Sequence, residues 1–148
     1  MTNAFWDAKA FNGDMSKWVV SSVTTMNIMF SSAISFNGDV SKWDVSSVTA
    51  MASMFKGATY FNGDVSKWDV SRVKYMNRMF SGARLFNGDV SKWDVSSVIS
   101  MDYMFSNAAS FQRKLCRTHW VLSKASKVDM FAGSLGSCLL YTSPSPRD

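Results

Sequence analysis

The sequence predicts an α/β solenoid in which each 25-residue coil contributes one short parallel strand and one short helix. Three observations lead to this fold class. Four blocks, 11–35, 36–60, 61–85 and 86–110, align without gaps on F-N-G-D-V-S-K-W-x-V-S-x-V-x-x-M-x-x-M-F-x-x-A-x-x. Within each block a strand-like apolar spacing is followed by a helix-like one. One block is too small to bury its apolar side chains alone, so the blocks must stack.

The strand is expected at the tryptophan of each block. Trp43 and Val45 flank the polar Asp44, which is the alternation of a short strand with one buried face. Stacking would place successive strands about 4.8 Å apart in a parallel sheet. Equivalent aromatic residues would then form two core columns: Phe11, Phe36, Phe61, Phe86 and Phe111, and Trp18, Trp43, Trp68 and Trp93.

The helix is expected at the methionines. Met51, Met54, Phe55 and Ala58 fall at i, i+3, i+4 and i+7, as on one face of a helix of about two turns. This spacing explains the methionines as core and disfavours a methionine copper site. The residues expected at the corners are Thr24 and Thr49 (N-caps), Gly57, Gly82 and Asn107 (helix exits), and the Asn-Gly pairs 12–13, 37–38, 62–63 and 87–88 (return turns).

Both ends of the chain depart from the complete repeat. Residues 1–10 match the second half of a block, with Met1 at the position of Met26, so we expect a partial coil and a longer natural protein. Residues 111–137 keep Phe111 and Trp120 with a small insertion and are expected to form a degenerate C-terminal capping coil.

The last eleven residues share no position with the repeat. Residues 138–148, CLLYTSPSPRD, resemble the translation of a sequencing-library transposon end and adapter. We therefore expect a disordered artefact and exclude the segment from the fold. A natural tail rich in proline and serine is the alternative.

Composition and charge exclude several classes of protein. The 148 residues are 47% hydrophobic, enough for a continuous core, and no apolar run is long enough for a membrane span. The net charge of +5 is uneven: residues 11–110 carry nine basic and eight acidic residues, and five basic residues within 111–137 face only Asp129. A basic terminal segment is typical of a solvated cap, so no nucleic-acid partner is expected.

Stacking converts the outward residues of the expected strands into columns of charge. The candidate binding residues are Lys17, Lys42, Lys67, Lys92, Asp44, Asp69 and Asp94. Val19 interrupts the aspartate column. Adjacent columns of opposite sign would form a lattice of exposed pairs, each contributing about 0–1 kcal/mol. This surface is the candidate interaction face, and a self-neutralising solvated surface is the alternative.

Other chemistry is poorly supplied. One aspartate follows each Asn-Gly pair: Asp14, Asp39, Asp64 and Asp89. Their carboxylates could bind calcium, but capping of the turn is the preferred interpretation. Cys116 and His119 could in principle activate a thiolate, but a structural pair is preferred. Zinc lacks ligands. No metal, cofactor or catalytic residue is expected, and the chain is not expected to be an enzyme.

The motifs also carry a family resemblance. V-x-x-W-x-V-x-x-V at 40–48, 65–73 and 90–98 resembles the core of leucine-rich repeats. The whole block, with F-N-x-D, S-x-W-D-V-S and M-x-x-M-F-x-x-A, is similar to the BspA-like repeat surface proteins, in particular their mycoplasma-lipoprotein branch. The resemblance implies a leucine-rich-repeat-like solenoid displayed outside the cell, although no secretion signal, lipid-attachment cysteine or anchor is present. A non-catalytic scaffold that binds protein or glycan is therefore expected, with a purely structural spacer or wall component as the alternative.

Overall fold

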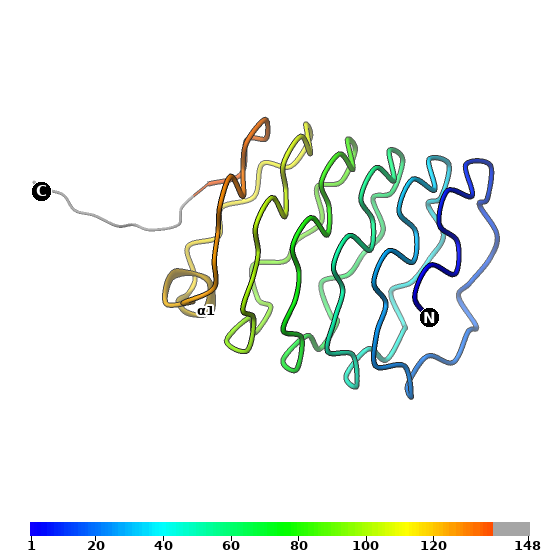
Figure 1. Ribbon diagram of the computed structural model, residues 1–148, viewed down its shortest axis with the longest axis horizontal. Helices are drawn as coiled ribbons and strands as arrows, with labels where there is room; N and C mark the ends of the chain where they lie inside the picture. The colour runs from blue at the N-terminus through cyan, green and yellow to red at the C-terminus, as the bar shows by residue number, and fades with distance from the viewer. Residues whose placement is uncertain (138–148) are drawn as a thin grey trace, which may run out of the picture.

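The computed structural model describes residues 1–137 and shows similar coils stacked in a row, with the N-terminus at one end of the row (Figure 1). The predicted adapter-derived segment lies outside the described residues. Within residues 1–137 the one helix is α1, Thr118–Val121, and the pairing between coils with strand geometry is limited to isolated parallel bridges. These bridges join Thr25, Ala50, Tyr75, Ser100 and Ser126 in succession, and Lys114 to Ser137.

The predicted fold class of strand-and-helix coils is therefore wrong. Where a strand was expected, the chain makes two tight turns in succession. The amide of Trp43 donates to the carbonyl of Val40 at 3.2 Å, and the amide of Val48 donates to the carbonyl of Val45 at 2.9 Å. Such three-residue closures belong to β-turns, so these amides do not bond to a neighbouring coil as they would in a sheet.

Aspartate side chains explain why the chain turns here. Asp39 Oδ1 accepts from the amide of Ser41 at 2.9 Å, and Asp44 Oδ1 accepts from the amide of Ser46 at 3.0 Å. Aspartate offers its own backbone this local partner two residues ahead, and the bond competes with regular strand pairing. The motif D-V-S thus occurs twice per coil and folds twice in the same way.

The predicted helix is also absent. The segment 51–58 is a run of overlapping turns, in which Met54 N donates to Met51 O at 3.3 Å and Ala58 N donates to Phe55 O at 3.0 Å. Ser53 and Gly57 have φ of 56° and 69°. An α-helix needs φ near −60° at every residue, whereas a turn of type II needs a positive φ at its third residue.

The amides between these turns hold the coils together. Met51 N, Ser53 N, Phe55 N and Gly57 N donate at 2.8–2.9 Å to carbonyls 24 residues later in the chain. A helix would have used the same amides internally. Every second amide of the segment therefore bonds to the next coil. The amides of Met54, Lys56 and Ala58 close turns within the coil, and that of Ala52 donates to Asn27 Oδ1 in the preceding coil at 2.8 Å.

The predicted aromatic columns do form the core. The rings of Phe36 and Phe61 stack with centroids 6.0 Å apart, and those of Trp43 and Trp68 stack at 6.4 Å. The indole nitrogen of Trp43 donates to the Met15 carbonyl at 3.0 Å, so the buried ring is satisfied. The same bond recurs at 3.0 Å for Trp68, Trp93 and Trp120. Trp18, in the first coil, is 43% exposed.

The last coil changes the register. The bridge from Ser100 reaches Ser126, a step of 26 residues, whereas the earlier bridges step by 25. Trp93 is followed by Trp120, which is fully buried on α1. The extra residues before Trp120 are thus accommodated by this short helix, which keeps the indole in the core and moves its neighbours outward.

The residues with positive φ allow a test of the overlapping turns described above. Ser32 has φ of 60° where Gly57 and Gly82 stand in the following coils. A left-handed conformation costs a non-glycine residue roughly 1–2 kcal/mol, so we expect Ser32→Gly to stabilise the chain by about 1 kcal/mol and Gly57→Ala to destabilise it by a similar amount. A β-carbon on Gly57 would meet no atom closer than 3.6 Å, so the effect is conformational. Urea unfolding measures both changes, and a neutral Gly57→Ala variant would contradict the backbone described here.

Candidate functional site

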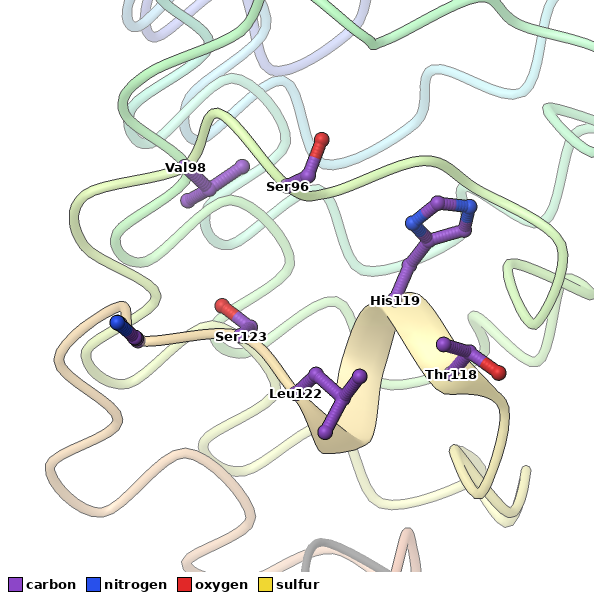
Figure 2. Close-up of a pocket in the computed structure, with 7 residues that line it drawn as sticks. Ser96, Val98, Thr118, His119, Leu122 and Ser123 are labelled. Carbon is purple, nitrogen blue, oxygen red and sulfur yellow. The ribbon is translucent and has the colours of Figure 1, made fainter.

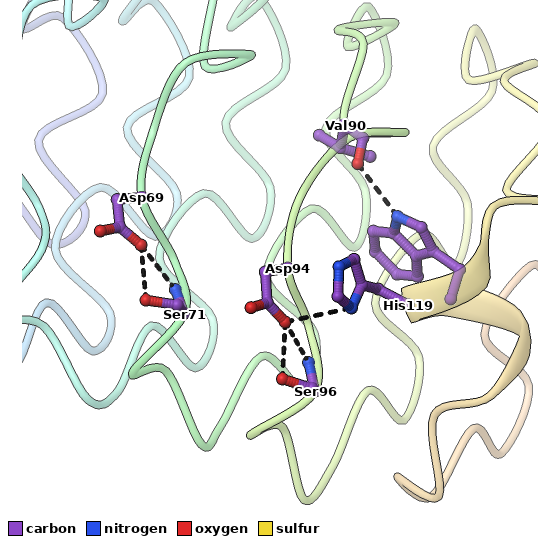
Figure 3. Close-up of polar contacts among 7 residues, drawn as sticks. Asp69, Ser71, Val90, Asp94, Ser96 and His119 are labelled. Carbon is purple, nitrogen blue, oxygen red and sulfur yellow. Dashed lines mark hydrogen bonds and ion pairs between the residues drawn. The ribbon is translucent and has the colours of Figure 1, made fainter.

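The aspartates of the candidate face are engaged in their own coils. Asp44 Oδ1 accepts from both the amide (3.0 Å) and the hydroxyl (2.6 Å) of Ser46. Asp69 and Asp94 repeat the arrangement with Ser71 and Ser96 at the same distances (Figure 3). Hydrogen bonds from the serine hydroxyl and then its amide lower the pKa of each carboxyl group. These side chains therefore stabilise turns, whatever else they contact.

The lysines of the face are placed differently. Lys17, Lys42, Lys67 and Lys92 are all exposed. In the described part of the chain, the Lys/Arg–carboxylate pair within 4.0 Å is Lys9–Asp7 at 3.8 Å, and His119 Nδ1 also lies 3.3 Å from Asp94 Oδ1. The lattice of direct lysine–aspartate pairs that the sequence suggested is thus not formed, because among residues 1–137 no carboxylate lies within 4.0 Å of these four ammonium groups.

The second aspartate column lies close to the lysines. Asp14, Asp39, Asp64 and Asp89 accept from the amides of Ser16, Ser41, Ser66 and Ser91 at 2.9–3.0 Å, which confirms the turn-capping interpretation. Bonds from the serine lower the pKa of each carboxyl group, and the adjacent lysine lowers it further.

The candidate interaction face and the second aspartate column together are called the Lys/Asp face. This face holds four lysines and seven aspartates and carries a net charge of −3. Among residues 1–137, no three His, Cys, Asp or Glu side chains gather into a group that could hold a metal ion.

A pocket of about 350 Å³ lies at the C-terminal end of this face (Figure 2). It lies between the last complete coil and α1, and its lining includes Ser96, Val98, His119 and Leu122. His119 reaches from α1 to the carboxylate of Asp94, with Nδ1 3.3 Å from Oδ1 (Figure 3). The sequence missed this pair because the register shift before Trp120 decides where His119 points.

The three side chains Ser96, His119 and Asp94 do not form a catalytic triad. In a triad the histidine lies between the nucleophile and the acid and removes the proton of the hydroxyl. Here the hydroxyl of Ser96 donates directly to Asp94 at 2.6 Å. The same serine–aspartate bond occurs at Ser46 and Ser71, in coils that have no histidine. Ser96 is therefore placed as a turn residue.

The thiolate pair considered from the sequence is not present either. Cys116 is disulfide-bonded and is not a free thiol. His119 bonds to Asp94 instead. A nucleophilic cysteine activated by this histidine therefore has no basis in the structure.

Comparison with known families found one matching family model. The family model described as "Mycoplasma protein of unknown function, DUF285" matches residues 1–75 and again residues 39–136. No curated protein and no solved structure matches the chain. Among the described residues there is no helix with the length and apolar character needed to cross a membrane. The two matches together cover nearly the whole chain, which therefore belongs to this mycoplasma-type repeat family of unknown function.

Proposed function

We propose that this protein is a non-catalytic interaction scaffold that binds a protein or glycan partner through the lysine column of the Lys/Asp face. One observation carries the proposal. Lys42, Lys67 and Lys92 are exposed on successive coils, and among residues 1–137 no carboxylate lies within 4.0 Å of their ammonium groups. A partner's anionic group can therefore contact an ammonium group without first breaking a direct ion pair, and because the seven aspartates give the face a net charge of −3, this contact must be local to the lysine column.

The regular spacing of the coils supports this role. Stacked core rings below the face lie about 6 Å apart, as the 6.4 Å between Trp43 and Trp68 shows. The lysines are carried on turns that the aspartates cap, so the backbone beneath them is ordered before binding. A partner with anionic groups at a similar repeat would contact several lysines at once.

The resemblance to the BspA-like surface proteins supports display of this scaffold outside the cell. The alternative role, a structural spacer, is favoured by a different observation. The aspartates of the face hold the turns of their own coils, so the repetition of D-V-S can be explained by folding alone.

Charge reversal separates the two roles. Lys42→Glu/Lys67→Glu is expected to weaken capture by arrays of sulfated and uronic-acid glycans and of acidic peptides by at least about tenfold. Lys74→Glu/Arg84→Glu makes the same change in net charge at exposed residues outside the column and should leave capture intact. Equal loss in both variants would show a non-specific charge effect and overturn the assignment of this face. A wild-type chain that captures nothing on the arrays would favour the spacer.

A further inference from the structure

A second pocket lies away from the Lys/Asp face, on the segments that had been expected to be helical. It has a volume of about 280 Å³ and is lined by Asn3, Trp6, Ile28, Ser31, Ser53 and Lys56. Backbone bonds align the three segments that supply these residues: Phe5 N donates to Met29 O, and Phe30 N donates to Met54 O, both at 2.8 Å. The pocket is therefore built from three neighbouring coils near the N-terminal end of the stack (Figure 1).

Ser31 supplies an unsatisfied polar group in this pocket. Its residue is only 6% exposed, yet within residues 1–137 no hydrogen bond is made by its side-chain hydroxyl. Its backbone is fully used, because the amide donates to Ile28 O at 3.2 Å and the carbonyl accepts from Asp7 N at 2.8 Å. A buried hydroxyl without a hydrogen-bond partner is energetically unfavourable. A ligand that bonds to Ser31 would recover this cost.

Trp6 and Lys56 supply two further recognition elements. Trp6 is 60% exposed, whereas the tryptophans from Trp43 onward are buried with their indole nitrogens bonded to carbonyls. Lys56 is exposed, and among the described residues no carboxylate lies within 4.0 Å of its ammonium group. The pocket thus combines a flat apolar ring, three side chains that form neutral hydrogen bonds, and one free cation.

We infer that this pocket binds a single ring of an acidic saccharide. The apolar C–H face of a pyranose packs on the indole of Trp6, its hydroxyl groups bond to Ser31 and Asn3, and its carboxylate meets the ammonium group of Lys56. The volume is below the roughly 300 Å³ at which sites for drug-sized ligands begin, so one ring fits and a larger ligand must extend beyond the pocket.

A nucleotide fits these groups less well. An aromatic side chain also stacks on a base, but nucleic-acid sites combine stacking with a groove of several cations that follows the phosphates. Among the described residues, Lys56 is the one cation that lines this pocket. The hydroxyl and amide groups around a single ring therefore favour the saccharide.

A pocket in later coils has some of the same groups, together with the carboxylate of Asp102. A pocket of about 250 Å³ is lined by Asn77, Arg78, Ser100, Asp102 and Tyr103, and the guanidinium of Arg78 lies 4.8 Å from the centre of the Tyr103 ring. An asparagine, a serine, an aromatic ring and a cation thus meet twice on one side of the stack. The first pocket has the unsatisfied buried hydroxyl and is the one proposed as the site.

The test is an NMR titration of the full chain with sodium D-glucuronate and, separately, with D-glucose. We expect saturable shifts of the Trp6 indole resonance with glucuronate and weaker binding of glucose. Trp6→Ala should abolish binding of both sugars. Lys56→Gln should weaken glucuronate about tenfold and leave glucose unchanged, because only the charged contact is lost.

Two serines provide a matched control. Ser106 is 8% exposed and occupies the position equivalent to Ser31 in a later coil, but it does not line the pocket. Ser31→Ala should weaken both sugars about fivefold without lowering the melting temperature, since the hydroxyl has no internal partner. Ser106→Ala should change neither. Lys42→Glu/Lys67→Glu should also leave the sugars unaffected, which separates this site from the proposed lysine face.

Three results would overturn the inference. The first is the absence of a saturable response to glucuronate. The second is an equal effect of Ser31→Ala and Ser106→Ala on sugar binding. The third is a stronger response of the Trp6 resonance to adenosine monophosphate than to glucuronate, which would assign the pocket to a nucleotide.

Discussion

Replacing Phe55 with alanine is expected to lower the free energy of unfolding by about 3–5 kcal/mol. Phe55 is fully buried, and its ring centroid lies 5.5 Å from that of Phe30, 3.9 Å from Phe61 and 5.6 Å from Phe80. The truncation would leave a cavity between three coils. Because amide bonds to the coils on both sides fix the spacing, the coils cannot close onto the gap. Urea unfolding followed by tryptophan fluorescence measures the loss.

The control for this change is the same substitution at the end of the column. Phe5 stacks on Phe30 at 5.4 Å and on Phe11 at 4.3 Å, but it is only partly buried. Phe5→Ala should therefore cost clearly less than Phe55→Ala. If the two variants lose the same stability, the central position of Phe55 in the stacked core does not have the energetic role assigned to it.

The second large effect is expected in acid. Among residues 1–137, eight aspartate carboxyl groups have a lowered pKa, and in each the largest cause is a hydrogen bond from a serine hydroxyl. They are Asp14, Asp39, Asp44, Asp64, Asp69, Asp89, Asp94 and Asp102. A carboxyl group with a pKa below its ordinary value of 3.8 stabilises the folded state once it is ionised. The contribution is therefore complete well above pH 3.8 and is lost as the pH falls through 3.8 toward the folded-state pKa.

The expected measurement is a melting temperature that changes little above about pH 5 and falls steeply below about pH 4. Asp44→Asn/Asp69→Asn gives the matched comparison. The amide oxygen of asparagine can still accept from Ser46 N and Ser71 N, but the side chain does not titrate. We expect a shallower fall in acid for this variant. An unchanged slope would show that the turn-capping carboxylates do not control acid stability.

The core was predictable from the sequence in detail. The apolar positions of the repeat in the central coils, among them Phe61, Trp68, Met76 and Ala83, are buried as the register predicts. The return turns predicted at the Asn-Gly pairs are not formed, because Asn37 and Gly38 lie outside any turn and Asn37 Oδ1 accepts from Asn62 N in the next coil. The aspartate caps, like the core, were anticipated. These features depend on side-chain polarity and on bonds between residues two positions apart, both of which are written in the local sequence.

The candidate site was predictable only in part. The lysine column was named from the repeat, and its residues are exposed as expected. The pairing of those lysines with Asp44 and its equivalents was wrong, because each carboxylate bonds to the serine two residues ahead. The pair of His119 with Asp94 and the pocket around Trp6 were missed. Each joins residues about 25 or more positions apart, and no spacing within a block indicates either.

The sequence by itself determined the 25-residue period and which side chains face inward, because apolar residues must leave water whatever backbone carries them. Only the tertiary structure decided the conformation of that backbone. The spacing of Met51, Met54, Phe55 and Ala58 suits one face of a helix, but it also suits overlapping turns that point the same side chains inward. The turns prevail because every second amide finds its acceptor 24 residues away, in the next coil, and that partner exists only when the coils are stacked.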